Sequence, residues 1–297
     1  MLTICVFHLA FFLVTTLGNL LVIRALWKAS SLPANMKKLF LSLACSDLAV
    51  GLFGQLMFGV IKAAMLKMEG NGKYTSDFLC PTILTVYFFS FFLACASFLS
   101  LTAIAVDRLL AVSLHLRYPE LATSKRVILT LVSLWLISGV AASMFISLPD
   151  TSDIVAAIIE FVGLLLITLA NVRIYKAVRY HQNQMRSQIP LPHVQARELL
   201  MIRQKKSTVT ALSVFVVFLA CYLPYLCLRI LSMFEGQRIS VLVAEAVSVF
   251  LVFLNSSLNP LIFYWRHREI REIVKHYVRK IFRMNNSDTE VGDTFSH

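Results

Sequence analysis

Seven apolar runs, each long enough to cross a lipid bilayer, divide the chain almost from end to end. The hydrocarbon core of a bilayer is about 30 Å thick, which takes roughly 20 helical residues to cross. With 58% hydrophobic against 15% charged residues and a mean hydropathy of +0.74, the chain has too little polar surface for a water-soluble protein. We therefore expect an all-α membrane protein, a seven-transmembrane helix bundle. The runs lie near residues 2–28, 37–64, 79–112, 125–148, 152–180, 200–233 and 239–264.

The positions of the basic residues predict how these spans are oriented. Of the 28 Lys and Arg residues, 23 lie in the loops after the first, third and fifth spans, at the adjoining span ends and in the C-terminal tail. Cytoplasmic loops of membrane proteins are enriched in Lys and Arg. We expect these ends to be cytoplasmic and the N-terminus extracellular, in a multi-pass protein of the plasma membrane. The net charge of +12 is then membrane-surface charge and does not indicate nucleic-acid binding.

The chain divides into three regions at the end of the last apolar run. Residues 1–264 hold the seven spans and form the transmembrane domain. Residues 265–283 place apolar residues at helical spacing among Arg, Lys and Glu, which predicts a short amphipathic helix at the cytoplasmic membrane surface. Residues 284–297 combine Ser and Thr with Asp and Glu, and a tail of this composition is usually disordered.

Most of the apolar runs contain a polar or helix-breaking feature that is costly inside a bilayer. A charged side chain at the centre of a span costs about 2.5 to 3.5 kcal/mol on insertion scales, so it persists mainly where it faces a bundle interior and has a function. The ordered set points to a seven-helix receptor. In chain order the features are Asn19, Asp47, Asp107-Arg108, Trp135, Pro224 and Asn259-Pro260.

With its flanking residues, this set resembles the motifs of the rhodopsin-like (class A) G-protein-coupled receptors. Each motif alone is weakly specific, but all occur in order and in the appropriate span. The resemblance implies a receptor, not an enzyme, that binds an extracellular ligand and promotes nucleotide exchange on a heterotrimeric G protein through the cytoplasmic ends of helices 3, 5 and 6. A receptor kinase and arrestin would be partners of its tail. The matched segments are Gly18 to Val22, Leu43 to Ala49, Asp107 to Val112, Leu116 to Tyr118, Trp135, Cys221 to Pro224 and Asn255 to Phe263.

Five oxygen-bearing residues stand where members of this family hold a sodium ion. The resemblance implies that they face one cavity in mid-membrane, with sodium as an allosteric modulator and no covalent cofactor. The alternative is a buried hydrogen-bond network in which the carboxyl group is protonated and no ion binds. The five residues are Asp47, Ser97, Asn255, Ser256 and Asn259.

The resemblance also assigns residues to G-protein coupling. Arg108 would release from Asp107 and meet the tail helix of the G protein, whereas the plain alternative is an interfacial ion pair worth about 0 to 1 kcal/mol. Gln204 stands where many members carry an acid, so we expect no ion pair between Arg108 and the sixth span. The inactive state would then be less restrained, and we expect some basal activity. The coupling residues are Asp107, Arg108, Leu116, Arg203, Lys205 and Lys206.

Proline residues in the last two spans suggest an activation switch. Pro224 and Pro260 each remove a helical hydrogen bond and can kink the span that contains them, although a kink that only serves packing remains an alternative at Pro224. The chain departs from the family where Tyr222, Phe263 and Gly163 replace the usual tryptophan, tyrosine and proline. The switch residues are Tyr222, Pro224, Asn259, Pro260 and Phe263.

The expected ligand pocket is apolar. Ser90 stands where amine receptors carry an aspartate and Phe253 where opsins carry the retinal-binding lysine, so neither ligand is expected. We expect an uncharged or anionic apolar ligand such as a lipid, with a basic peptide as the alternative, and the same aromatic residues could equally serve core packing. The pocket residues are Phe58, Tyr87, Ser90, Phe91, Ala94, Val155, Tyr225, Leu226, Arg229, Glu245, Val249 and Phe253, of which Arg229 and Glu245 would lie at the mouth.

Within the family, the short second extracellular loop without cysteine and the absent span-five proline are most similar to the melanocortin, lysophospholipid, cannabinoid and adenosine receptors, the melanocortin receptors above all. Met57, Cys80 and Tyr87 replace the acidic cluster with which melanocortin receptors hold calcium, so an orphan relative is expected. A receptor-like scaffold that does not signal also remains open. A transporter is disfavoured because the chain has no internal repeat, and an enzyme because its histidines do not cluster.

Overall fold

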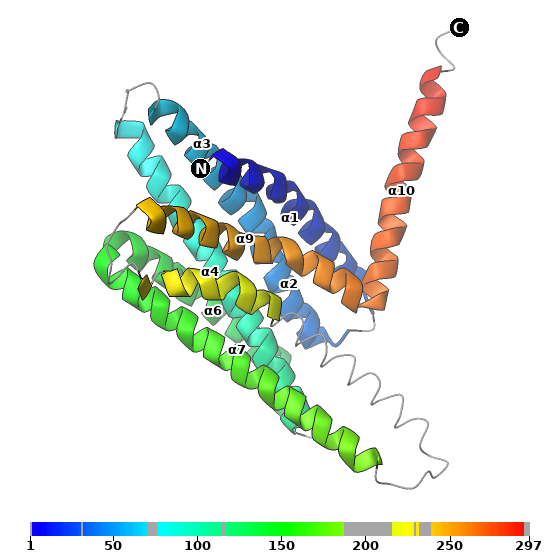
Figure 1. The fold of residues 1–297 in the computed structure, drawn as a ribbon. Coiled ribbons are helices and arrows are strands. Elements are labelled where there is room, and N and C mark those ends of the chain that lie inside the picture. Colours follow the sequence, from blue (N-terminus) through cyan, green and yellow to red (C-terminus); the bar gives the residue numbers. More distant parts are fainter. Residues whose placement is uncertain are drawn as a thin grey trace.

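All regular structure in the described part of the chain is helical. The structure, a computed structural model, describes residues 2–30, 32–69, 76–114, 117–186, 216–228, 230–231 and 239–293. Figure 1 shows the long helices side by side, with α10 departing from the end of α9. The elements are α1 (Leu2–Lys28), α2 (Ala34–Ala49), η1 (Val50–Gln55), α3 (Leu56–Glu69), α4 (Ser76–Leu114), α5 (Tyr118–Leu121), α6 (Ser124–Ser147), α7 (Pro149–Arg186), α9 (Ile239–Arg266), α10 (Arg268–Asp293) and the segment Val216–Leu228, here called the sixth-span helix.

Six of these helices are long and apolar enough to cross a membrane, and the sixth-span helix is apolar but shorter in the part described. A bilayer offers no partners for backbone polar groups, so helices, which satisfy these groups internally, are the expected way for such segments to span it. The six helices and the shorter one match the seven predicted runs in order, which confirms the all-helical membrane fold. The six spans are Val6–Lys28, Ala34–Ile61, Pro81–Leu114, Ser124–Met144, Ile154–Ala177 and Ala246–Arg266.

The second span is continuous but irregular, because η1 is a π-helix between α2 and α3. A π-turn inserts extra backbone into a helix and changes the direction in which the following side chains point. At its end, Gln55 is fully buried and donates from Nε2 to the carbonyl oxygen of Phe253 in α9 over 3.1 Å. The π-turn therefore supplies a polar contact between the second and seventh spans that hydropathy alone did not predict.

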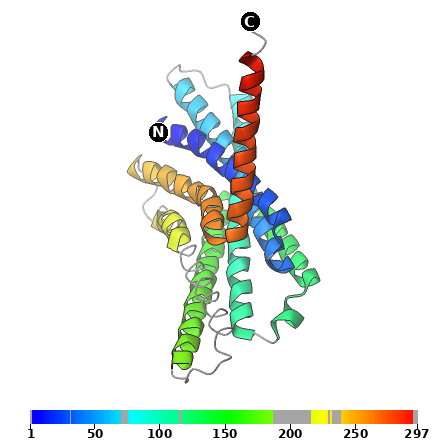
Figure 2. The same cartoon turned by 90° about the vertical axis from the view of Figure 1, so that its right-hand side faces the viewer.

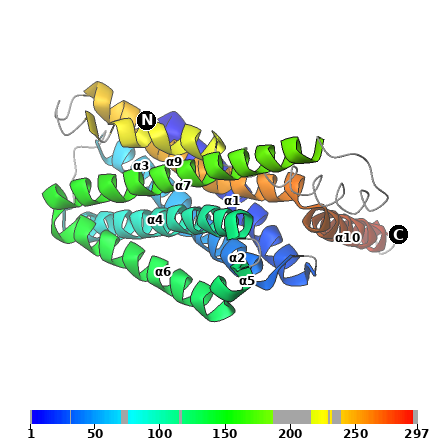
Figure 3. The ribbon, with the colours of Figure 1, turned by 90° about the horizontal axis from the view of Figure 1, so that it is seen from below.

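Helix α4 is the central helix of the bundle. It packs against α2, α6 and α7, as the view from below shows (Figure 3), while α1 packs against α2, α3 and α9. The larger buried core joins α1 and α2 to α4, α7, the sixth-span helix and α9. This arrangement brings the predicted site residues of α2, α4 and α9 into one interior.

The connection after α9 turns α10 away from the bundle (Figures 1 and 2). Ser30 fixes the start of α10 by donating from its backbone N and its Oγ to Glu269 Oε1, over 2.7 and 3.1 Å. Farther along, the Lys28 ammonium lies 4.9 Å from the ring centroid of Tyr277. Helix α10 extends to Asp293, beyond position 283 where the sequence suggested its end. The division into a membrane-surface helix and a tail stays a prediction.

Candidate functional site

The Asp47 carboxyl group is the centre of a fully buried polar cluster. Ser97 in α4 donates from Oγ to Asp47 Oδ1 over 2.6 Å, and Asn259 in α9 donates from Nδ2 to Oδ2 over the same distance. Ser256 also interacts with the carboxyl group, and Asn255 is buried one turn before Asn259. The structure therefore brings together residues from α2, α4 and α9 that lie up to 212 positions apart.

A second polar network continues from this cluster towards α1. Asn19 donates from Nδ2 to the carbonyl oxygens of Thr15 and Ser256. Thr15 Oγ1 in turn lies 2.6 Å from Ser257 Oγ and 2.8 Å from Gln55 Oε1. The sequence singled out Asn19 but missed Thr15 and Gln55, whose polar side chains could have been noticed in apolar runs.

The donor set of the Asp47 cluster fits a hard cation such as sodium. Carboxylate, hydroxyl and amide oxygens are the ligands that such ions prefer. Asn19 Oδ1 is buried and lacks a hydrogen-bond partner among the described residues, which is the kind of orphaned acceptor that a water or cation would satisfy. The described residues contain no group of three or more His, Cys, Asp or Glu side chains that could hold a metal ion.

The Asp107-Arg108 pair occupies the end of α4 that adjoins α5. Arg108 donates from Nε to Asp107 Oδ2 over 3.0 Å and makes a second, very short contact through Nη2. Tyr118 at the start of α5 donates to Asp107 Oδ1 over 2.8 Å. Burial first, and then the hydrogen bond to Asp107, raise the pKa of Tyr118 to about 12. The phenol therefore remains a proton donor, and both carboxylate oxygens are occupied.

Four of the predicted coupling residues cannot be placed. Leu116, Arg203, Lys205 and Lys206 lie outside the described residues. The structure instead adds His267, which follows α9 and packs its ring on Phe40 at 5.5 Å between centroids. Burial, followed by the charges of Arg266 and Arg108, lowers the pKa of His267 to about 4. The His267 ring is therefore neutral at physiological pH, and the positive charge of Arg108 disfavours its protonation.

Tyr222 of the predicted switch belongs to a buried stack of three rings. It lies 4.4 Å from Phe218 and 5.3 Å from Phe98 between ring centroids. Phe98 extends from α4 towards α7, where a Cβ at Gly163 would lie only 2.2 Å from Phe98 Cε1. The missing side chain at Gly163 is therefore what admits the Phe98 ring. The sequence identified Gly163 as a departure but not the ring that fills its place.

The switch residues of α9 lie where this helix approaches α1 and α2. Pro260 sits inside α9 and packs so closely on α1 that a Cβ at Gly18 would lie 2.9 Å from the proline ring. Phe263 is buried, with its ring 4.8 Å from that of Phe40. Pro224 lies within the sixth-span helix and is partly buried. Whether these residues switch between states stays a prediction.

Several predicted pocket residues gather in one small core cluster around Phe58. Tyr87 and Phe253 both lie 6.0 Å from the Phe58 ring, and Val249 packs against the same cluster. The sequence missed His8, a buried residue of α1 whose ring lies 5.1 to 5.5 Å from those of Phe58, Phe250 and Phe253. Neither ring nitrogen of His8 has a hydrogen-bond partner within the described structure.

The remaining pocket residues are divided between other surroundings. Ala94, Tyr225 and Leu226 belong to the larger core, whereas Ser90 is buried with no partner for its hydroxyl in the described part of the chain. Arg229 and the side chain of Glu245 lie outside what the structure describes. Phe91 and Val155 are partly buried.

Glu160 is a charged residue inside a span that the sequence analysis did not assign. It lies in α7 within the apolar stretch Ile154–Ala177. It interacts electrostatically with the Cys95 thiol of α4 and the Tyr222 hydroxyl. An ionisable residue at this depth is expensive, so it marks a candidate functional position. A single Glu in a run of apolar residues was a signal available in the sequence.

Comparison with known proteins agrees with this arrangement. A family model described as 7 transmembrane receptor (rhodopsin family) matches residues 18–156 and 149–263. Among curated relatives, the histamine H2 receptor of Cavia porcellus is 27% identical over 91% of this chain and 77% of that receptor. The melanocortin receptor 3 of Rattus norvegicus is 26% identical over 90% and 82%, respectively. The trace amine-associated receptor 7h of the same species is 28% identical over 92% and 82%. The chain therefore belongs to the rhodopsin family of seven-transmembrane receptors.

Proposed function

We propose that this receptor promotes nucleotide exchange on a heterotrimeric G protein through the cytoplasmic ends of α4, α7 and the span that contains the sixth-span helix. The observation that carries the proposal is the ion pair between Asp107 and Arg108. Arg108 donates twice to Asp107 Oδ2, while Tyr118 donates to the other carboxylate oxygen. A guanidinium held this way is restrained but partly exposed. It can exchange its neighbour for the carbonyl groups of a partner helix when the bundle opens.

The proposal includes an orientation and further partners. The basic ends of the first, third and fifth spans would lie in the cytoplasm, where the membrane surface is anionic. The receptor would then present its N-terminus outside the plasma membrane. The Ser- and Thr-containing tail would meet a receptor kinase and arrestin in the cytoplasm, since phosphate groups on such a tail attract basic partner surfaces.

The Asp47 cluster would hold sodium in the inactive receptor. Asp47 would provide a carboxylate, Ser97 and Ser256 would provide hydroxyl oxygens, and Asn255 and Asn259 would provide amide oxygens. All five residues are buried, and Ser97 Oγ and Asn259 Nδ2 donate to the Asp47 carboxyl group. An ion in this position would stabilise the close packing of α2, α4 and α9 around the Asp47 cluster. A bound ion shifts a conformational equilibrium only by its differential affinity for the two states.

For the ligand, we favour an uncharged or anionic molecule with a large apolar part. The aromatic cluster of Phe58, Tyr87 and Phe253 supports an apolar body, and His8 and Ser90 supply buried polar groups that lack partners among the described residues. A few convergent polar groups in an apolar surround are typical of small-molecule sites. Arg229 at the mouth would pair with an acid group.

A cationic amine is the second candidate, and Glu160 favours it. The histamine H2 and trace amine-associated receptors are named for amine ligands, but Ser90 offers no charge to pair with one. Glu160 in α7 is a carboxyl group inside the bundle that interacts with Tyr222 and Cys95. An amine could pair with it from a position deeper than the pocket expected from the sequence. A basic peptide that pairs with Glu245 is the remaining alternative.

The coupling proposal is tested by nucleotide exchange. Purified receptor in lipid nanodiscs is mixed with each of a panel of heterotrimeric G proteins, and GDP release is followed with and without a ligand library. Arg108→Ala should abolish receptor-dependent exchange and leave the amount of folded receptor unchanged. Arg117→Ala is the matched control, because Arg117 is an exposed arginine nearby whose side chain makes no hydrogen bond or ion pair with the described residues. Normal exchange by Arg108→Ala would show that coupling does not depend on this residue.

Three variants separate the ligand candidates once a binder is found. Arg229→Ala should weaken an acidic lipid by about 1.5 to 3 kcal/mol, the cost of losing a charged hydrogen bond. Glu160→Gln should weaken an amine instead, and Glu245→Ala a basic peptide. A ligand whose affinity is unchanged in all three variants would contradict each of these assignments.

A further inference from the structure

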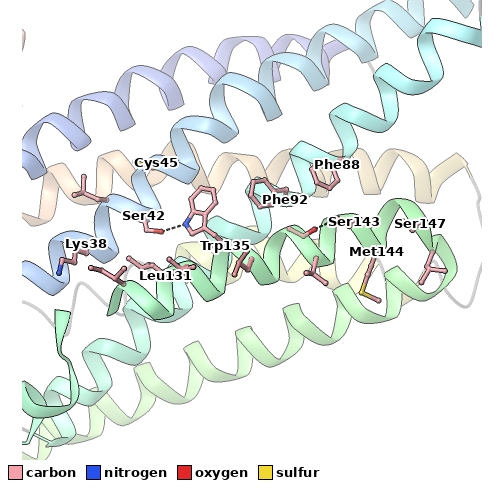
Figure 4. Close-up of a pocket in the computed structure, with 17 residues that line it drawn as sticks. Lys38, Ser42, Cys45, Phe88, Phe92, Leu131, Trp135, Ser143, Met144 and Ser147 are labelled. Atoms are coloured by element: carbon pink, nitrogen blue, oxygen red, sulfur yellow. Dashed lines mark hydrogen bonds between the residues drawn. The ribbon is translucent and has the colours of Figure 1, made fainter. Parts of the chain in front are cut away.

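A large groove lies outside the bundle interior, where α2, α4 and α6 meet (Figure 4). Its volume is about 1120 Å³, above the range of about 300 to 1,000 Å³ typical of small-molecule sites. Most of its lining is apolar. None of the residues that the sequence assigned to the ligand pocket lines it. The groove is therefore a separate candidate site.

One face of α6 forms the length of the groove. Ile128, Trp135, Gly139 and Ser147 all line it, at helical spacing over five turns. At a rise of 1.5 Å per residue, this face extends for roughly 30 Å, which is the thickness of the hydrocarbon core. Lining residues of this face are themselves exposed, such as Val140 at 62% and Ile128 at 50%. The groove is consequently open to the lipid along its side.

The middle of the groove has a rigid aromatic wall. Trp135 donates from Nε1 to Ser42 Oγ over 3.1 Å, and Ser42 Oγ lies 3.0 Å from Ser100 Oγ. Phe92 meets the indole edge to face, with 5.6 Å between centroids. The N–H of Trp135 is thus hydrogen-bonded within the protein, and the indole ring contributes apolar surface to the groove. A fixed apolar wall suits a hydrocarbon chain.

The groove has one charged residue, and it lies at one end. Lys38 is in the second turn of α2, and Figure 4 shows it at the opposite end of the groove from Met144 and Ser147. Within the described residues Lys38 takes part in no ion pair. A lysine can lay its methylene chain on apolar surface and hold its ammonium at the membrane interface. This position complements a negatively charged head group.

We infer that the groove binds an anionic phospholipid, with the phosphate at Lys38 and one acyl chain lying along α6 past Trp135. The combination of a single cation at the membrane interface and an apolar channel of membrane thickness matches a molecule with an anionic head and a long hydrocarbon tail. Such a lipid would contact α2, α4 and α6 together. It would therefore support the packing of the two helices that carry Asp47 and Ser97.

The test is lipid retention measured by native mass spectrometry. The whole receptor is released from mixed micelles that contain phosphatidylglycerol and phosphatidylcholine, and the bound lipids are counted. The wild-type receptor should retain phosphatidylglycerol preferentially. Lys38→Ala should lower this preference about fivefold, the effect of one lysine at a membrane surface, and Lys38→Arg should preserve it. Lys37→Ala is the matched control, because Lys37 is on the same helical turn but does not line the groove.

A second variant tests the acyl-chain part of the site. A Cβ at Gly139 would have only Phe92 Cε2 within 4 Å, at 3.8 Å, so Gly139→Leu can project into the groove without a clash at its root. This variant should lose retention of both lipids. If Gly139→Leu fails to fold, the inference is tested by the comparison of Lys38→Ala with Lys37→Ala.

Three results would overturn the inference. Equal retention of phosphatidylglycerol by wild type and Lys38→Ala would remove the head-group site. Displacement of the phospholipid by an added sterol, with no dependence on Lys38, would assign the groove to a sterol. A change in the receptor's dimer fraction in Gly139→Leu, with lipid retention unaltered, would assign the face to a second copy of the chain.

Discussion

Replacement of Gly163 by alanine should destabilise the receptor, although the same change usually stabilises a helix. Alanine is favoured over glycine in a helix interior by about 0.8 to 1.0 kcal/mol. At Gly163, however, the new Cβ would lie 2.2 Å from Phe98 Cε1 and 2.4 Å from Phe98 Cζ. Carbon atoms approach comfortably to only about 3.5 Å. The Phe98 ring would therefore have to retreat by more than about 1 Å.

The surroundings of Phe98 leave little room for this movement. Its ring is 2% exposed and is backed by Phe218 and Tyr222, each 5.3 Å away between centroids. Overpacking of a core by a methyl group costs about 1 to 3 kcal/mol. After the helical gain is subtracted, we expect a net loss of about 1 kcal/mol in Gly163→Ala.

The loss is measured as the apparent unfolding temperature and the inactivation half-life of purified receptor in micelles. Gly139→Ala in α6 is the control, because its Cβ would meet Phe92 Cε2 at an ordinary 3.8 Å, and this variant should be slightly more stable than wild type. Phe98→Leu should recover part of the loss when combined with Gly163→Ala. Equal stabilisation by both glycine substitutions would refute the role of Gly163 in admitting the ring.

Two further substitutions test histidines, the buried His8 and the partly buried His267. His8→Phe should stabilise the folded receptor by about 1 kcal/mol or more, because it removes a ring whose two nitrogens have no partner in the described structure; a less stable variant, measured by the same unfolding assay, would show that a partner exists. His267 has its folded pKa lowered from 6.5 to about 4 by burial and by Arg266 and Arg108. The unfolded state therefore binds the proton first, and stability should fall as pH drops from 6.5 towards 4. His267→Gln should reduce this loss of stability at acid pH. If stability changes with pH between 7 and 5 as steeply in His267→Gln as in wild type, His267 is not the group responsible.

The fold could be predicted because a bilayer leaves few choices. Backbone groups in lipid must be satisfied within the span, so hydropathy alone located the membrane-spanning helices that the structure describes. The Asp47 cluster was also predictable in part. The resemblance to the receptor family predicted its residues, and the structure joins Ser97 and Asn259 to the Asp47 carboxyl group.

Contacts that depend on how each helix is rotated could not be predicted. The π-turn at Val50–Gln55 changes the direction of Gln55, and no hydropathy pattern encodes that change. The Tyr118 hydroxyl reaches Asp107 only because α5 folds back beside the end of α4. His8 and Glu160 were visible as polar residues in spans, but the rings around His8 belong to α3 and α9, and only the folded bundle brings them together.

Basal nucleotide exchange at different sodium concentrations tests the central claim most directly. GDP release by the most responsive G protein is measured with wild type and Asp47→Asn in nanodiscs, with potassium replacing sodium at constant ionic strength. If the Asp47 cluster stabilises the inactive receptor and Arg108 couples it to the G protein, wild-type exchange should fall as sodium rises. Exchange by Asp47→Asn should not respond. The same sodium response in both proteins, or no receptor-dependent exchange with any G protein, would contradict the account.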